Sequence, residues 1–123
     1  MTQSEDIILL PEVLSLRREG ESLALDLRVP ERLAYLPGHF PGTPIVPGVV
    51  QIQWAVHFAR EYLGLELPFG HMEVVKFKDL LLPGQQLTLL LRYQAESGKV
   101  KFSFRAGDRE FSSGRLYFRK DDV

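Results

Sequence analysis

The stretch PGVVQIQWAVHFAREYLG, residues 47–64, decides the fold of this chain. Pro47 suits the first turn of a helix, where its missing N–H is no loss, and Gly64 suits the C-terminal cap. Apolar residues cover most of the circumference between these two ends. Because a helix that is apolar nearly all round is usually buried, we expect a buried helix over 47–63 with Trp54 and Phe58 in the core.

One stripe of this helix is polar. Gln53, His57 and either Arg60 or Glu61 fall at i, i+4 and i+7 or i+8. A polar stripe on a buried helix needs partners. The stripe therefore faces solvent, another subunit or a pocket.

Alternating apolar and polar residues predict strands on both sides of the helix. Leu23, Leu25 and Leu27 follow the turn signal REGES (18–22), which indicates a β-hairpin. Gly114, inside the last expected strand, suggests a bulge or a close backbone approach. The connections are too short for parallel crossovers, so the sheet should be antiparallel. Further strands are expected in MEVVKFKDLLL (72–82), LTLLLRYQ (87–94), VKFSFRA (100–106) and FSSGRLYFRK (111–120).

The composition fits one α+β domain over residues 1–123. The formal net charge of -1 gives no excess of positive charge for nucleic acid. The absence of cysteine excludes disulfides, thiolate metal sites and a cysteine nucleophile, and it fits a reducing compartment. The N-terminus is acidic rather than basic, and no apolar run approaches the roughly 18 residues of a membrane span. We therefore expect a cytoplasmic protein with no membrane span.

A single helix covers only part of such a sheet, which leaves exposed edge strands. Joining two sheets edge to edge would remove some of these edges. We therefore expect a homodimer or a higher even oligomer.

The segment before the helix holds one histidine, His39, among residues that stiffen or sharply turn the chain. A fixed loop that delivers one imidazole onto the start of a helix can position a base. The free N–H groups of Gly48 and Val49 could polarise a carbonyl there. Together they indicate proton abstraction next to a carbonyl; the alternative is that His39 is only a turn residue. The stiffening residues are Pro37, Gly38, Pro41, Gly42, Pro44, Pro47 and Gly48.

The other candidate residues carry weaker signals. His57 is interpreted as a partner on the helix stripe, and His71, beside Gly70, as a surface residue in a loop. The histidines do not combine with carboxylates at metal-ligand spacing, so no metal site is expected. No phosphate-binding loop, dinucleotide fingerprint or nucleophile elbow is present in the sequence. The solvated faces of strands, or a shallow basic surface for an acidic carrier protein, would account for Lys99, Lys101, Arg105, Arg115, Arg119 and Lys120.

The motif GHFPGTPIVPGVV (38–50) resembles the signature of the β-hydroxyacyl-(acyl carrier protein) dehydratases, which are hotdog-fold enzymes. VVKFKDLLLPGQQL (74–87) resembles a strand–turn–strand of the same family, and order and spacing agree over about residues 7–119. VPGVVQIQW (46–54) is most similar to the dehydratase-like branch associated with aryl polyene pathways.

The resemblance implies a hotdog fold, in which an antiparallel sheet wraps one long helix and a tunnel lies between two subunits. His39 matches the catalytic histidine, and Gly48 matches the glycine whose N–H holds the thioester carbonyl. The implied substrate is a 3-hydroxyacyl chain on the phosphopantetheine arm of an acyl carrier protein or coenzyme A. The implied hydro-lyase products are a trans-2-enoyl thioester and water, with no further cofactor.

The sequence departs from the family at Gln53, where the family has Glu or Asp; His57 stands where Gln is common. An amide cannot donate a transferable proton to the leaving hydroxyl, although it can hold that hydroxyl or a water. Three functions remain open. They are a dehydratase in which His39 moves the proton and Gln53 orients the hydroxyl, a hotdog thioesterase, and a non-catalytic carrier-binding subunit paired with an active homologue.

Overall fold

The computed structural model describes residues 10–31 and 45–118. Within these ranges the chain forms one helix and six strands. The elements are β1 (Glu12–Glu19), β2 (Ser22–Arg28), α1 (Gly48–Leu63), β3 (Phe69–Phe77), β4 (Gln86–Gln94), β5 (Lys99–Ala106) and β6 (Arg109–Phe118).

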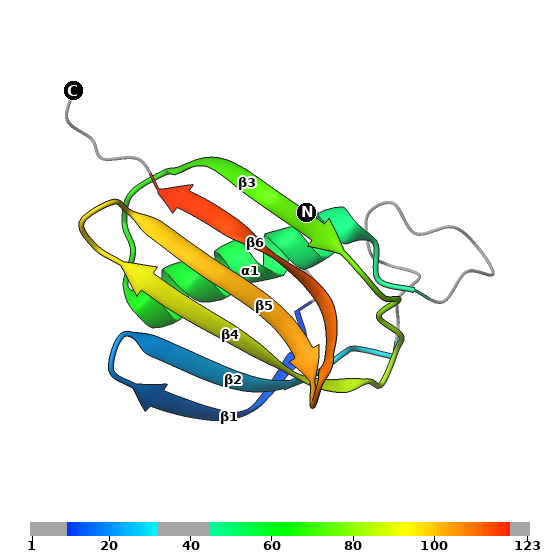
Figure 1. Cartoon of the computed structure of the whole chain (residues 1–123). Helices are drawn as coiled ribbons and strands as arrows, with labels where there is room; N and C mark the ends of the chain where they lie inside the picture. The colour runs from blue at the N-terminus through cyan, green and yellow to red at the C-terminus, as the bar shows by residue number, and fades with distance from the viewer. Residues whose placement is uncertain (1–9, 32–44, 119–123) are drawn as a thin grey trace, which may run out of the picture.

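The six strands form one sheet in the order β1-β2-β4-β5-β6-β3. Every neighbouring pair is antiparallel. Figure 1 shows α1 lying against one face of this sheet, with β1 at one edge and β3 at the other. The predicted helix-and-antiparallel-sheet architecture is confirmed.

The core lies between α1 and the inner face of the sheet. The predicted alternation holds in β2 and β5, because every second residue is buried. Trp54 and Phe58 of α1 are 0% and 2% exposed, as expected. Fully burying an apolar side chain contributes about 1.5–3 kcal/mol, so this two-layer contact is the main source of stability. The sheet contributes Leu23, Leu25, Leu27, Leu89, Leu91, Val100, Phe102, Phe104 and Leu116 to the core.

The ends of α1 lie where the sequence predicts them. Pro47 is the N-cap residue, and Gly64 closes the C-terminus in the left-handed region with φ 68°. The helix is buried against the sheet, as expected, and the described residues leave its other side exposed. Val49 remains 55% exposed. The reason is that a single sheet contacts only the face carrying Val50, Gln51, Trp54, Ala55, Phe58 and Ala59.

Strand β3 departs from the regular alternation expected of it. Its pairing with β6 shifts between Glu73 and Lys76, and Val74 adopts a φ of 53°. A positive φ is uncommon for a β-branched residue and marks local strain. Gly114 of β6 pairs in register with Phe102, and a Cβ there would lie 2.9 Å from the Phe102 ring. Gly114 therefore permits a close approach, and it also faces the irregularity in β3, because Glu73 pairs with Arg115 and Lys76 pairs with Ser113.

Candidate active site

The start of α1 presents backbone donors. The Pro47 carbonyl accepts hydrogen bonds from the N–H groups of Val50 and Gln51 at 3.1 and 3.2 Å. Among residues 10–31 and 45–118, no acceptor pairs with the N–H of Gly48 or Val49. Unpaired N–H groups at a helix start favour an oxygen that carries negative charge. The backbone at Gly48 and Val49 can therefore bind a polarised carbonyl oxygen.

Buried hydrogen bonds fix the position of this helix start. Val46 N–H donates to the Leu81 carbonyl at 2.8 Å. The Gln51 side chain donates through Nε2 to the Val46 carbonyl at 3.2 Å and accepts from Ser112 Oγ at 2.7 Å. Gln51 and Ser112 are 3% and 0% exposed. The helix start is thus attached both to the segment after β3 and to β6.

An aromatic ring covers Gly48. A Cβ at this position would lie 2.8 Å from Cζ and 2.9 Å from Cε1 of Phe77, closer than real Cβ contacts. Only glycine lets the ring approach the first turn in this way. Phe77 is itself 49% exposed, so its ring forms a wall beside the N–H groups of the helix start.

Three candidate residues share the exposed side of α1. Val49, Gln53 and His57 follow one another at four-residue steps, which places them on one helix face. Gln53 is exposed, and His57 Nε2 lies 3.0 Å from Glu61 Oε1. The described part of the chain therefore leaves this face uncovered, and the polar stripe faces outward.

The surroundings of this face are apolar although they are exposed. Strand β3, at the edge of the sheet, and the segment after it carry large apolar side chains that the described residues do not bury. Exposed apolar surface of this extent often marks an interaction or ligand site. These residues are Met72, Phe77, Leu80 and Leu82, which are 41–58% exposed.

His39 lies outside the described residues, so its predicted position beside Gly48 stays a prediction. His71 is a surface residue, as interpreted, but the expected loop is wrong because His71 lies within β3. Its ring stacks on Tyr117 with centroids 4.6 Å apart, and its Nε2 lies 3.3 Å from Glu73 Oε2.

Hydrogen bonds and neighbouring cations lower the pKa of three carboxyl groups in the described ranges. Hydrogen bonds from Ser15, Arg17 and Thr88 lower the pKa of Asp26 to about 2. The Arg109 guanidinium lowers the pKa of Asp79, and Lys78 with Ser103 lowers that of Glu110. In the described ranges, no group of three or more His, Cys, Asp or Glu residues could hold a metal ion.

Two residues of the site escaped the sequence analysis. Gln51 shares a helix face with Trp54, Ala55 and Phe58 through i, i+3, i+4 and i+7 spacing, so it is polar at a core position. That spacing could have revealed it. Phe77 gave no comparable signal, because only the fold brings its ring to Gly48.

Comparison with known proteins shows the family of the chain. The family model described as ApeI-like, ApeI dehydratase, matches residues 15–115. The chain belongs to the ApeI dehydratase family. It is also 29% identical over 109 residues to the 3-hydroxyacyl-[acyl-carrier-protein] dehydratase FabZ of Lactobacillus helveticus, covering 80% of this chain and 74% of that protein. Identity to the FabZ of Natranaerobius thermophilus is 34% over 94 residues, or 68% and 66% of the two chains.

Solved structures of similar proteins have the same fold. The dehydratase heterocomplex ApeI:P from Xenorhabdus doucetiae matches with a TM-score of 0.80 and 27% identity, over 89% of this chain and 98% of the other. A protein from Erwinia carotovora subsp. atroseptica matches with a TM-score of 0.75 and 32% identity, over 91% and 98%. The expected hotdog fold and the dehydratase relationship are confirmed. Among the described helices, none is long and apolar enough to span a bilayer.

Proposed function

We propose that this chain is a 3-hydroxyacyl thioester dehydratase whose substrate is carried by an acyl carrier protein or coenzyme A. The observation that carries the proposal is the start of α1, where Gly48 and Val49 offer N–H groups without an acceptor in the described chain. Membership of a dehydratase family supports the same chemistry.

The N–H groups of Gly48 and Val49 bind the thioester carbonyl, whose oxygen gains negative charge as the α-proton leaves. His39 removes that α-proton. The electron pair of the C–H bond forms the new double bond, and the bond from the β-carbon to the hydroxyl breaks. His39, now an imidazolium, returns the proton to the departing hydroxyl, so that the products are water and a trans-2-enoyl thioester.

Gln53 orients the leaving hydroxyl in this proposal. Its amide offers both donors and an acceptor, but no proton that it can transfer. Because Gln53 lies on the face of α1 that the described residues leave uncovered, it would act on a substrate bound between this helix and a partner subunit. General acid–base assistance is typically worth 10²–10⁴-fold, so the single proton carrier makes this a slow dehydratase.

A homodimer joined along β3 would complete this site. Strand β3 is a sheet edge and carries exposed Met72 and Phe77. Edge-to-edge pairing would cover those side chains and remove an unpaired edge. Light scattering should give a dimer or higher even oligomer at micromolar concentration, and a monomer would count against a shared site.

A non-catalytic subunit that pairs with an active homologue is the second candidate. Similarity to a protein described as a dehydratase heterocomplex favours it, together with the amide at position 53. Under this alternative the partner along β3 would be the homologue.

Incubation with a 3-hydroxyacyl carrier thioester, followed by mass spectrometry and a thiol assay, separates the candidates. Loss of one water without free thiol supports the dehydratase. Free carrier thiol without an enoyl product would instead identify a thioesterase. Activity that appears only after a homologue is added would identify the non-catalytic subunit.

A further inference from the structure

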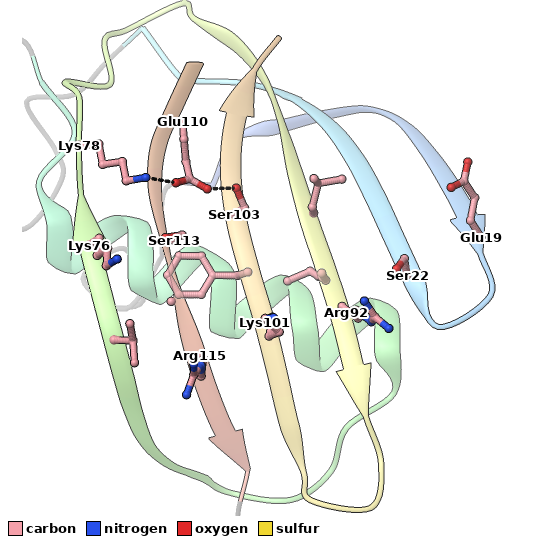
Figure 2. A pocket seen from close by; sticks show the side chains of 15 residues that line it. Glu19, Ser22, Lys76, Lys78, Arg92, Lys101, Ser103, Glu110, Ser113 and Arg115 are labelled. Atoms are coloured by element: carbon pink, nitrogen blue, oxygen red, sulfur yellow. Dashed lines mark hydrogen bonds and ion pairs between the residues drawn. The ribbon is translucent and has the colours of Figure 1, made fainter. Parts of the chain in front are cut away.

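The outer face of the sheet, opposite α1, contains a hollow of about 600 Å³ lined by side chains from every strand. Figure 2 shows these side chains in front of the sheet, with α1 behind it. Five of them are cationic and two, Glu19 and Glu110, are acidic, so the formal charge is 5 − 2 = +3. The cations are Lys76, Lys78, Arg92, Lys101 and Arg115.

Three of the cations form a row across the sheet. Arg92 of β4 pairs with Lys101 of β5, and Lys101 pairs in turn with Arg115 of β6. Residues directly opposite in an antiparallel pair have Cβ atoms about 4.5–5.5 Å apart, and like charges at that separation repel. The row therefore costs stability when nothing binds to it.

A second set of charges on the same face shows that the sheet can neutralise such residues. Glu110 lies 2.9 Å from Lys78 and 3.7 Å from Arg105, and it accepts a hydrogen bond from Ser103 at 2.8 Å. By contrast, Arg92 and Lys101 form no ion pair with any residue in the described ranges. Arg115 has only a long contact of 3.9 Å with Glu73.

Apolar side chains flank the cationic row. Leu90 is 38% exposed and lines the hollow from β4. Val74 lines it from β3 with 51% exposure, at the residue whose φ of 53° is strained. Strained residues often occur at binding sites. Ser103 and Ser113, small side chains between these two, leave the space that forms the hollow.

We propose that this hollow binds an acidic amphipathic helix of a partner protein. Carboxylates on one helix edge pair with Arg92, Lys101 and Arg115, while apolar side chains beside them contact Leu90 and Val74. Helix residues at i and i+4 are about 5–6 Å apart, which matches the spacing of neighbouring strands, about 4.8 Å.

The chemistry of the hollow favours a protein helix over nucleic acid, because exposed apolar side chains add nothing to phosphate binding and the chain has a net charge of -1. The hollow is separate from the candidate active site. Gly48 does not line it, and α1 lies on the other face of the sheet. The proposal therefore stands independently of the dehydratase activity.

The test uses the full chain and a synthetic helical peptide with glutamates at i, i+4 and i+8 beside a leucine stripe. A peptide with glutamine at those positions is the matched control. Calorimetry at low salt should show at least tenfold tighter binding of the glutamate peptide. Equal affinity of the two peptides, or tighter binding of a single-stranded oligonucleotide, would overturn the proposal.

Lys101→Glu should weaken peptide binding at least tenfold while raising the urea midpoint, because it replaces two repulsive cross-strand pairs with attractive ones. Lys99→Glu makes the same charge change on the same strand but outside the hollow, and should alter affinity less than threefold. Equal losses of peptide affinity in both variants, or a lower urea midpoint for Lys101→Glu than for wild type, would contradict the proposed site. Turnover of a coenzyme A thioester should stay within twofold in both variants.

Discussion

Ser112 Oγ donates a hydrogen bond of 2.7 Å to Gln51 Oε1 and so joins β6 to the first turn of α1. The same amide donates to the Val46 carbonyl at 3.2 Å. Because both side chains are buried, water cannot replace either bond. This pair therefore fixes where the N–H groups of Gly48 and Val49 lie relative to the sheet.

Gln51→Leu should lower the free energy of unfolding by about 1–3 kcal/mol, since it leaves the Ser112 hydroxyl and the Val46 carbonyl buried without a partner. Urea denaturation measures the loss. Ser112→Ala should lower the free energy of unfolding by about 1 kcal/mol. The double variant should lose less free energy of unfolding than the sum of the two single losses, because both partners of the hydrogen bond are then absent. Strict additivity would show that the hydrogen bond contributes nothing.

Gly48→Ala should reduce kcat/KM at least tenfold with a stability loss of only about 1 kcal/mol. The new Cβ would lie 2.8 Å from the Phe77 ring, so this half-exposed ring must shift beside the N–H groups of the helix start. Steady-state kinetics and thermal melting measure the two effects. Phe77→Leu in the Gly48→Ala background should recover part of the activity, whereas no recovery would mean that the methyl group itself blocks the carbonyl site.

The boundaries of α1 could be predicted from the sequence because Pro47 and Gly64 encode its two ends locally. The strands follow from alternation, which depends only on neighbouring residues. The contact between Phe77 and Gly48 could not be predicted, because it depends on how β3 passes the helix. The row through Arg92, Lys101 and Arg115 likewise depends on strand register.

The outward-facing side of α1 shows another limit of sequence analysis. The apolar circumference correctly predicts a helix on a sheet, but it cannot distinguish burial within one chain from burial against a partner. Val49 is apolar and 55% exposed, whereas Gln51 is polar and 3% exposed. The Gln51 amide is buried because Ser112 and Val46 satisfy its hydrogen bonds, and the contact with Ser112 joins residues 61 positions apart in the chain.

Asp26 should make stability depend on acid pH. Its pKa is lowered from 3.8 to about 2, so its ionised form stabilises the fold above pH 4 and this contribution is lost as the pH falls toward 2. Asp26→Asn should cost about 1 kcal/mol at pH 7, after solvent screening of its ion pair. The difference from wild type should disappear near pH 2 in denaturant titrations. Asp108→Asn, in the β5–β6 turn, makes the same change of side chain and serves as the control.

Gln53→Glu should raise the dehydration rate by up to about 10²-fold if position 53 occupies the acid position of the family. The two side chains are nearly isosteric, and only the transferable proton is new. His57 could hold the new carboxylate in its ionised form, since it lies one helical turn away. The double variant Gln53→Glu with His57→Gln tests this coupling. Rates at or below wild type for both variants would show that Gln53 serves substrate binding or another chemistry.

The most direct test of the account is a time course of a 3-hydroxyacyl carrier thioester with wild-type protein and His39→Ala, followed by mass spectrometry. We predict that wild type converts the substrate to a product lighter by one water, while His39→Ala is slower by about 10²–10⁴-fold with an unchanged circular dichroism spectrum. A wild-type protein that forms no enoyl product, or a His39→Ala variant with the wild-type rate, would contradict the account.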